Sequence, residues 1–344
     1  MDSGPWTLDF GLRTPARDLS ELAFELWSGF AYNPHVSGVF AQPINATTRY
    51  CAVYGHPVGH SASPAMQNAG LAALGLNWRY LAFDVHPDNL RAALEGARVA
   101  GFIGINLTVP HKLLALDIVD ALDESAKAWG AVNTVRFEGR EKRGEWRPLR
   151  EFETAPENVR SHGFNTDADA ITLAVREDLG LELKGAKVLL FGVGGAGRTA
   201  ALKLASERVS ELSLVNRTAS KAEAVAKEIH ARYPGVDVRL GYPRESVELV
   251  LNATSLGLKA EDSLPINEKQ FSLRRAGAVY DMIYRPAETP LLKAAKAAGC
   301  RTANGLSMLL YQGAKALELW TGQSAPLEIM RNALEKDIYA ERPN

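Results

Sequence analysis

The sequence contains few of the residues and patterns that mark exported, membrane-spanning or metal-binding proteins. Only two of its 344 residues are cysteines, Cys51 and Cys300, and they form no C-x-x-C pair, so two free thiols in a reducing compartment are expected. The seven histidines show no ligand spacing such as H-E-x-x-H, and no metal site is predicted. No apolar run reaches the roughly 18 residues that cross a bilayer, and Asp2, Asp9 and Asp18 interrupt the place where a signal peptide has its apolar core. These absences favour a cytoplasmic protein.

An excess of charge of one sign is also lacking. The chain carries 39 basic and 40 acidic residues, a formal net charge of −1, which argues against binding to nucleic acid or to a membrane surface. The sequence shows no internal repeat and no low-complexity tract. A length of 344 residues is typical of two domains that each bury a core, and the expected partner is a small-molecule substrate. The sequence leaves open whether the protein is a monomer or a homodimer.

What the sequence does contain, from residue 50 onward, is an alternation of strand-like and helix-like segments. Strands are predicted at 50–54, 80–84 and 101–107, from 187, and at 212–215, 249–251 and 278–283. Helices are predicted at 64–74, 87–97, 112–117, 169–178, 289–298, 308–320 and 326–336. This alternation indicates an α/β fold with mainly parallel sheets covered by helices. Residues 136–162 interrupt it with a dense run of mixed charges, which predicts a solvated hairpin or a mobile loop.

The most informative segment is a glycine-rich turn between an apolar strand and a helical pattern. It contains Gly192, Gly194 and Gly197 in the spacing G-x-G-x-x-G, with Gly195 and Ala196 between the last two. A side chain at Gly192 or Gly194 would hold a pyrophosphate away from the backbone N–H groups at the start of the helix. The turn therefore predicts a dinucleotide cofactor.

The end of the next strand indicates which dinucleotide is bound. An NAD-binding unit usually carries an acidic residue there, which accepts a hydrogen bond from the ribose 2′-hydroxyl. This chain has Asn216, Arg217 and Thr218 instead, and the Arg217 guanidinium suits a 2′-phosphate. Lys221 is a second candidate for the phosphate, although a solvated lysine in a first helical turn explains it equally well. NADP is the predicted cofactor.

Polar residues also follow or begin several elements before the glycine turn, in the runs 60–64, 106–112 and 165–167. In an open α/β sheet, ligands bind beyond the carboxyl ends of the strands, where such loops converge. Together with later segments, these runs resemble the shikimate dehydrogenase family, from about residue 50 to the last helix. The matching segments are 61–64 (Ser-x-Ser-Pro), 106–112 (Asn-Leu-Thr-Val-Pro-His-Lys), 130–134 (Gly-Ala-Val-Asn-Thr), 165–167 (Asn-Thr-Asp), 216–218 (Asn-Arg-Thr), 252–255 (Asn-Ala-Thr-Ser), and 308–309 (Met-Leu) with Gln312.

The resemblance implies two α/β domains with the active site in the cleft between them. Residues 49–166 and 305–344 would form a substrate-binding domain with a mainly parallel sheet, and residues 167–304 a Rossmann NADP-binding domain. Residues 1–48, with one short amphipathic stretch at 19–27, form an extension to which no role is assigned. The implied reaction is the reversible reduction of 3-dehydroshikimate to shikimate by NADPH, in aromatic amino-acid and chorismate biosynthesis.

The same resemblance makes Lys112 the catalytic lysine and Asp167 its partner. As a ketone accepts hydride, negative charge grows on its oxygen, and a fixed ammonium stabilises the transition state more than the ground state. Which of the two groups moves the proton stays open. The residues alone, without the resemblance, favour another interpretation, with Lys112 an exposed lysine in a first helical turn and Asp167 an N-cap.

The resemblance assigns substrate contacts to seven residues. Ser61, Ser63 and Tyr284 would hold the carboxylate, and Asn106, Thr108, Asn133 and Gln312 the ring hydroxyls. Ser63 has a competing interpretation, because a serine before Pro64 is also a favourable N-cap. Gln312 lies in an apolar helical stripe with Leu309, Ala316 and Leu319, where its amide needs a partner, either the substrate or a backbone group.

The remaining cofactor contacts implied by the family are Thr254, Ser255 and Gly305, although a turn at the end of a strand explains Thr254 and Ser255 almost as well. The chain departs from the family pattern at Gln67, Asn304 and Ser307 and over residues 168–170. These departures leave quinate, or both quinate and shikimate, as an alternative substrate. Two alternative functions are also considered. One is a non-catalytic NADP-binding sensor, which needs neither Lys112 nor Asp167, and the other is a folate-type dehydrogenase of the same architecture.

Overall fold

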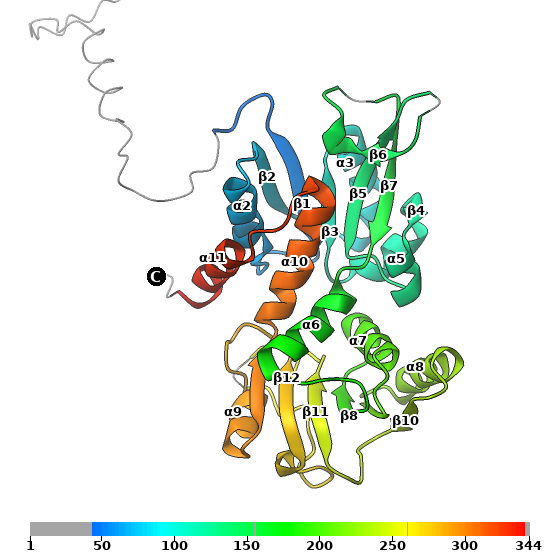
Figure 1. The fold of residues 1–344 in the computed structure, drawn as a ribbon, viewed down its shortest axis with the longest axis vertical. Helices are drawn as coiled ribbons and strands as arrows, with labels where there is room; N and C mark the ends of the chain where they lie inside the picture. Colours follow the sequence, from blue (N-terminus) through cyan, green and yellow to red (C-terminus); the bar gives the residue numbers. More distant parts are fainter. Residues whose placement is uncertain (1–42, 143, 155, 260, 341–344) are drawn as a thin grey trace, which may run out of the picture. The chain divides into compact units, whose positions relative to one another are not determined.

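The computed structural model describes residues 43–142, 144–154, 156–259 and 261–340. The predicted amphipathic stretch at 19–27 lies outside this part of the chain. The described residues form two β-sheets, each with helices packed against it (Figure 1), which confirms the predicted α/β class. None of the helices in these ranges is both long and apolar enough to cross a membrane.

The first sheet has the strand order β2-β1-β3-β5-β7-β4, with β6 paired to β5. The strands are β1 (Arg49–Gly55), β2 (Trp78–Asp84), β3 (Gly104–Leu107), β4 (Ala121–Leu122), β5 (Thr134–Arg140), β6 (Arg147–Pro148) and β7 (Asn158–Phe164). As predicted, β1 is parallel to both of its neighbours, β2 and β3. β5 then runs antiparallel to β3 and β7. The half of the sheet that contains β1, β2 and β3 is therefore parallel. At the other edge, the short strand β4 pairs in parallel with β7.

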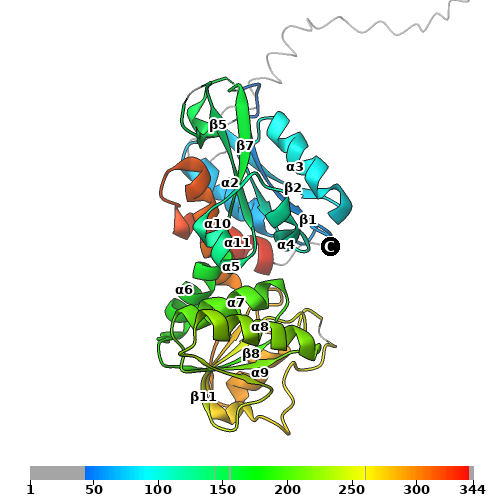
Figure 2. The ribbon, with the colours of Figure 1, turned by 90° about the vertical axis from the view of Figure 1, so that its right-hand side faces the viewer.

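Helices cover both faces of the first sheet. They are α2 (Ser63–Ala73), α3 (Leu90–Val99), α4 (His111–Leu114), α5 (Glu124–Trp129), α10 (Leu306–Thr321) and α11 (Leu327–Tyr339). Figure 2 shows α3 and α10 on opposite faces of the sheet. The predicted helix at 87–97 begins as a 3₁₀ turn at Pro87–Asn89, and the one predicted at 112–117 divides into α4 and the 3₁₀ turn Ala115–Asp117.

The segment 136–162 forms a hairpin, which was one of the two predicted alternatives, but the predicted solvation is wrong for part of its strands. Its first and last parts are β5 and β7, which pair along their whole lengths. Glu138 on β5 is only 2% exposed, and Arg136, Arg160 and His162 all direct their side chains to its carboxylate. A buried carboxylate is tolerated when charged partners satisfy it. The dense charge of the segment therefore includes one buried cluster, contributed by neighbouring strands.

The second sheet is parallel throughout, in the order β10-β9-β8-β11-β12-β13. The strands are β8 (Lys187–Phe191), β9 (Glu211–Val215), β10 (Asp237–Leu240), β11 (Val247–Asn252), β12 (Ala276–Asp281) and β13 (Arg301–Asn304). The direction of the strand order reverses between β8 and β11, and in sheets of this type dinucleotides bind at the carboxyl ends of the strands on either side of that point. The glycine turn directly follows β8 and therefore lies there.

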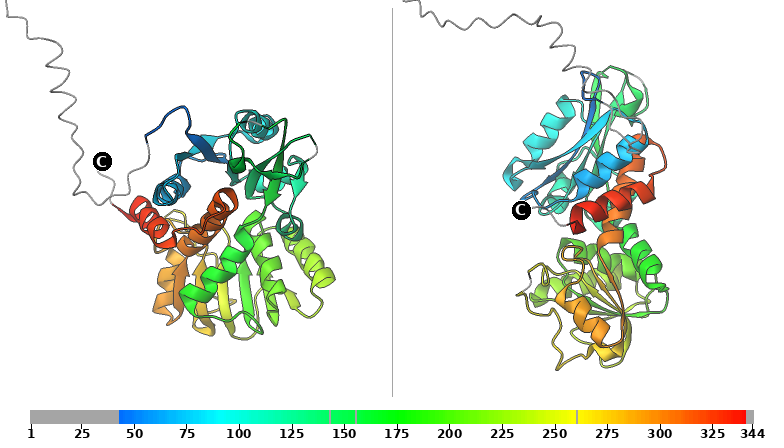
Figure 3. Two further views of the ribbon diagram at one scale, coloured as in Figure 1. Left: turned by 45° about the horizontal axis from the view of Figure 1, so that its top comes forward. Right: turned by 90° about the vertical axis from the view of Figure 1, so that its left-hand side faces the viewer.

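Two apolar cores lie on the two faces of the second sheet. One face packs against α6 (Asp167–Leu179), α7 (Gly195–Ser206) and α8 (Ala219–Arg232), and the other against α9 (Pro290–Ala297) and the segment before β12. Figure 3 shows α9, in orange, and the green helices on opposite faces. The cores are formed by residues that alternate along the strands, for example Val188 and Leu190 on one face and Leu189 and Phe191 on the other.

Two helices carry the chain between the sheets. The chain leaves the first sheet at β7 and continues directly into α6, and it returns from β13 through α10, which packs against both α6 and α2 (Figure 1). The carboxyl half of α10 enters the first core with Leu317 and Trp320, and the Trp320 indole donates a hydrogen bond to the Val135 carbonyl of β5 at 3.0 Å. The predicted domain limits at 167 and 305 coincide with the starts of these helices, and the division of binding roles between the domains stays a prediction.

Candidate active site

A cavity of about 160 Å³ is lined by most of the predicted catalytic and substrate-binding residues and by one predicted cofactor contact. These nine residues are Ser61, Ser63, Asn106, Thr108, Lys112, Asp167, Tyr284, Gly305 and Gln312. The first five follow the carboxyl ends of β1 and β3 or belong to those strands and to the helices after them. The others come from the start of α6, the segment after β12 and the start of α10. Elements that are distant in the sequence therefore supply one polar cavity.

At the cavity wall, Lys112 and Asp167 form an ion pair. The Lys112 Nζ lies 2.7 Å from the Asp167 Oδ2, with side-chain exposures of 21% and 5%. The lysine is held in place because its carbonyl accepts a hydrogen bond from the Val132 N–H at 2.8 Å. The aspartate stands in the first turn of α6. The pair presents a cation to the cavity and keeps the anion largely behind it.

Asp167 is not the N-cap of α6, so that alternative is wrong. The Asn165 Oδ1 accepts the N–H groups of Asp167 and Ala168, both at 3.1 Å, and satisfies the open end of the helix. The Asp167 carboxylate is therefore left to accept from Lys112 and, at 2.9 Å, from the Asn133 amide.

Ser63 is not an N-cap either. Helix α2 has Ala62 at its N-cap position and no side-chain capping bond, while Pro64 occupies the first turn. The hydroxyl of Ser63 does not close the helix; it lies at the cavity wall next to the Tyr80 hydroxyl, and the Ser61 Oγ accepts the Ser63 N–H at 3.4 Å. The geometry suits the predicted carboxylate contact, which stays a prediction.

Behind the cavity lies a polar layer that sequence reasoning described only in part. Asn133 is 1% exposed and is not among the residues of the cavity wall; its amide donates to Asp167 and its carbonyl oxygen accepts the Thr166 N–H at 2.7 Å. The structure thus places Asn133 one layer behind Asp167, and its substrate contact stays a prediction. Tyr80 and Thr134 were missed, although Thr134 belongs to the quoted segment 130–134.

Of the two partners considered for Gln312, the structure shows the backbone group, and it adds a contact with the Asn133 side chain. The Gln312 Nε2 donates to the Leu309 carbonyl one turn earlier at 2.8 Å, and its Oε1 lies 3.5 Å from the Asn133 Nδ2. Tyr284 also faces the cavity, and burial raises the pKa of its hydroxyl above the ordinary value. The hydroxyl is therefore neutral at physiological pH and able to donate a hydrogen bond to an anion.

The glycine turn after β8 has the shape that a pyrophosphate requires. Gly192 has φ +84°, and a Cβ there would lie 2.8 Å from the Thr254 methyl carbon; a Cβ at Gly197 would lie 2.1 Å from the Gly192 carbonyl oxygen. Gly194 and Gly195 are different, because a Cβ at either would meet nothing within 4 Å. The space before the N-terminus of α7 is therefore open to a ligand, and the backbone N–H groups there fit a phosphate.

The end of β9 supplies the other cofactor candidates. The Asn216 Oδ1 accepts the Val193 N–H at 3.0 Å and its Nδ2 donates to the Thr218 carbonyl at 2.8 Å, so Asn216 fixes the glycine turn to the strand end. Arg217 and Lys221 are exposed, and no side-chain hydrogen bond or ion pair engages either of them within the described part of the chain. Their charges are available to an anion, and their contact with a 2′-phosphate stays a prediction.

Three further residues were predicted to contact the cofactor. The Thr254 Oγ1 donates to the Asn252 Oδ1 at 2.7 Å and accepts the Leu256 N–H at 3.1 Å, so the turn at the strand end accounts for this side chain. Ser255 is exposed beside it. At Gly305 a Cβ would lie 2.1 Å from the Met282 carbonyl oxygen, which explains the glycine by close packing. Among the described residues no cluster of histidine, cysteine and acidic side chains is arranged to hold a metal.

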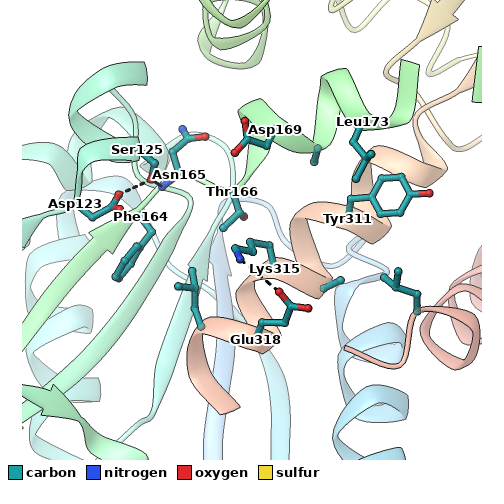
Figure 4. Close-up of a pocket in the computed structure, with 14 residues that line it drawn as sticks. Asp123, Ser125, Phe164, Asn165, Thr166, Asp169, Leu173, Tyr311, Lys315 and Glu318 are labelled. Atoms are coloured by element: carbon teal, nitrogen blue, oxygen red, sulfur yellow. Dashed lines mark hydrogen bonds and ion pairs between the residues drawn. The ribbon is translucent and has the colours of Figure 1, made fainter. Parts of the chain in front are cut away.

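A larger cavity, of about 410 Å³, lies on the other side of the start of α6 (Figure 4). Asn165 and Thr166 line it, whereas the next residue, Asp167, lines the smaller cavity. In the same way Tyr311 of α10 faces the larger cavity and Gln312 the smaller one. The Lys112–Asp167 pair therefore borders the smaller and more polar of the two cavities.

Comparison with known proteins covers most of the chain. Residues 53–135 match the shikimate dehydrogenase substrate binding domain, residues 174–251 the family described as shikimate / quinate 5-dehydrogenase, and residues 305–335 the shikimate 5′-dehydrogenase C-terminal domain. The shikimate dehydrogenase (NADP(+)) of Methanocaldococcus jannaschii is 38% identical over 301 residues, which are 85% of this chain and 98% of that protein.

Solved structures agree with the sequence relatives. A shikimate dehydrogenase crystallised in complex with NADP+ has a TM-score of 0.75 and 35% identity, and the match covers 87% of this chain and 99% of that one. The shikimate 5-dehydrogenase of Thermus thermophilus, in complex with NADP(H) and shikimate, has a TM-score of 0.69 and 36% identity, over 84% of this chain and 99% of that one.

Proposed function

The chain belongs to the shikimate dehydrogenase family, and we propose that it catalyses the reversible, NADP-dependent reduction of 3-dehydroshikimate to shikimate. The observation that carries this proposal is the Lys112–Asp167 ion pair at the wall of a polar cavity. Relatives named for this reaction match the chain over almost their whole length. The step belongs to aromatic amino-acid and chorismate biosynthesis.

In the proposed reaction, Lys112 stabilises the charge that develops on the substrate. NADPH supplies the hydride when it is bound. The ammonium of Lys112, held by Asp167 at 2.7 Å, lies where it can meet the oxygen of a carbonyl that enters the cavity. Because the cation is fixed before the reaction begins, little energy is spent on reorienting it as the oxygen becomes negative.

The remaining groups of the cavity wall orient the substrate. Ser61, Ser63 and Tyr284 offer hydroxyls to its carboxylate, and Asn106, Thr108 and Gln312 offer polar groups to its ring hydroxyls. For the cofactor, the backbone at Gly194 and Gly195 would hold the pyrophosphate and Arg217 the 2′-phosphate. In this proposal residues 49–166 and 305–344 bind the substrate, residues 167–304 bind NADP, and the protein is a cytoplasmic monomer or homodimer.

One assay tests the activity, the substrate and the cofactor together. Purified protein is incubated with shikimate or quinate in the presence of NADP or NAD, and formation of the reduced nucleotide is followed by its absorbance. We expect turnover with shikimate and NADP. Preferential turnover of quinate would replace the substrate, and one of the family models matched by the chain is described for both acids. Binding of NADP without turnover of either acid would favour a sensor.

A further inference from the structure

Tyr80, a buried residue of β2, lies directly behind the cavity wall. Its side chain is 1% exposed, and its ring packs against Trp320 of α10 with 6.0 Å between the ring centroids. The hydroxyl donates to the Asn106 Oδ1 at 2.7 Å. Burial raises the pKa of Tyr80 well above its ordinary value, so the hydroxyl keeps its proton and remains a donor. The buried Tyr80 hydroxyl is thus hydrogen-bonded to Asn106, a residue that is proposed to contact the substrate.

The orientation of the Asn106 amide follows from its other partners. Its Nδ2 donates to the main-chain carbonyl of Asn133 at 3.2 Å and to the Thr134 Oγ1 at 3.0 Å. A main-chain carbonyl is only an acceptor, so the NH₂ group has to face it and the Oδ1 has to face Tyr80. Both hydrogens of the Nδ2 are used inside the chain. The Oδ1 has two lone pairs, and Tyr80 occupies one of them.

We propose that Tyr80 is a positioning residue of the substrate site, which fixes the Asn106 amide so that its Oδ1 accepts a hydrogen bond from a ring hydroxyl of the substrate. The inference rests on the proposed function and specifies the direction of one hydrogen bond in it: the substrate hydroxyl donates and Asn106 accepts. Asn106 lies in the cavity wall, and because its Nδ2 is engaged by Asn133 and Thr134, the second lone pair of the Oδ1 is the position left for the substrate.

The proposal makes the effect of Tyr80 depend on the substrate. Shikimate has two ring hydroxyls that do not react, at C4 and C5. The Tyr80 hydroxyl also neighbours the Ser63 hydroxyl. If Tyr80 acts through Asn106 and not through Ser63, its hydroxyl matters only when the substrate carries the ring hydroxyl that Asn106 binds. If Tyr80 only supports the fold, its loss affects every substrate equally. The two cases are distinguished by a double-mutant cycle in which the Tyr80 hydroxyl and a substrate hydroxyl are removed separately and together.

The experiment compares the wild type with Tyr80→Phe, which retains the ring and its packing. Initial rates are measured with shikimate, 4-deoxyshikimate and 5-deoxyshikimate. With shikimate we expect the KM to rise about 3- to 10-fold, as for loss of one neutral hydrogen bond, with kcat and the KM for NADP nearly unchanged. With one of the two deoxy analogues we expect the wild type and the variant to have the same kcat/KM. Equal losses with all three substrates, or no loss with shikimate, would overturn the proposal.

Two further variants serve as controls. Tyr54→Phe removes a hydroxyl from the adjacent strand β1, where the ring packs on Phe83 and no side-chain hydrogen bond is formed within the described residues. We expect it to leave all three substrates unaffected. Thr134→Val removes the acceptor on the opposite side of Asn106 and should also raise the KM for shikimate, and Thr134→Ser should restore it. Failure of the wild type to oxidise shikimate would count against the proposed function and not against Tyr80.

Discussion

Behind the smaller cavity, at the first sheet, the polar side chains have partners within the chain, whereas Arg217, which is proposed to meet NADP at the second sheet, has no side-chain partner among the described residues. Asn133 and Asp167 are buried and hydrogen-bonded on several sides. Arg217 is exposed, and Gly194 borders open space. The first region is ordered before a ligand arrives, and the second is completed by the ligand. Substitutions in the first should therefore act through neighbouring groups, and those in the second on cofactor binding alone.

The largest effect is expected from Lys112→Ala. Loss of the ammonium removes the charge that is proposed to stabilise the developing oxyanion and leaves Asp167 buried without its cation. We expect kcat to fall by about 10²- to 10⁴-fold, with a small change in the KM for shikimate. The dissociation constant for NADP, measured by fluorescence titration, should not change. Lys127→Ala removes an exposed lysine that pairs only with Glu124 and should retain full activity. Near-normal turnover of Lys112→Ala would remove this residue from the mechanism.

The buried carboxylate of Glu138 extends the comparison from activity to stability. Burial opposes its ionisation, but hydrogen bonds from His162, Arg136 and Arg160 outweigh burial and lower the pKa of Glu138 to about 2. Because the pKa is lower in the folded than in the unfolded chain, the stabilisation is complete above about pH 4.5 and is lost as the pH falls towards 2.

Glu138→Gln should therefore lower the free energy of unfolding at pH 7 by about 3 kcal/mol, and the loss should shrink as the pH is lowered through this window. Urea unfolding at several pH values measures both effects. Glu95→Gln, which breaks an exposed pair with Arg98, is the matched control and should cost far less than Glu138→Gln. A cost for Glu138→Gln that does not vary below pH 4.5 would contradict the assigned pKa.

The difference between the two regions also explains what the sequence could predict. The glycine turn and the polar segments at the strand ends were found because their chemistry depends on residue type and local spacing. Most strands and helices followed from apolar periodicity. β10 and β13 were missed because both lie at sheet edges and most of their residues are exposed or half-buried, so neither has an apolar run.

The buried cluster around Glu138 and the layer behind the cavity were harder to predict because the partners in each are distant in the sequence. Glu138 and Arg160 are 22 residues apart, and a run of mixed charges gives no sign that one carboxylate is buried among them. Tyr80 looks like an ordinary residue of a half-buried strand, and its partner Asn106 is 26 residues away. Asn133 was identified from its motif, but only the structure shows that it stands behind Asp167.

A smaller effect, confined to the cofactor, is expected from Arg217→Ala. Because Arg217 has no side-chain partner among the described residues, its loss should leave the fold unchanged. The KM for NADP should rise about 10- to 100-fold, as for loss of a charge-assisted hydrogen bond to phosphate, and the KM for NAD should change little. Steady-state kinetics with both nucleotides measures the ratio. Equal increases for NADP and NAD would place the 2′-phosphate elsewhere.

The smallest effect is expected from Gly194→Ala, which tests the open region most directly. The added methyl group meets no atom of the chain within 4 Å, and Gly194 has φ −68°, which an alanine adopts without strain. We therefore expect unchanged thermal stability but about 3- to 10-fold weaker binding of NADP, because the methyl group enters the space proposed for the pyrophosphate. Gly197→Ala is the contrasting variant, since its methyl group would lie 2.1 Å from the Gly192 carbonyl oxygen and should destabilise the fold itself. If Gly194→Ala bound NADP as tightly as the wild type, the pyrophosphate would not approach the backbone at this glycine, and the open space before α7 would need another explanation.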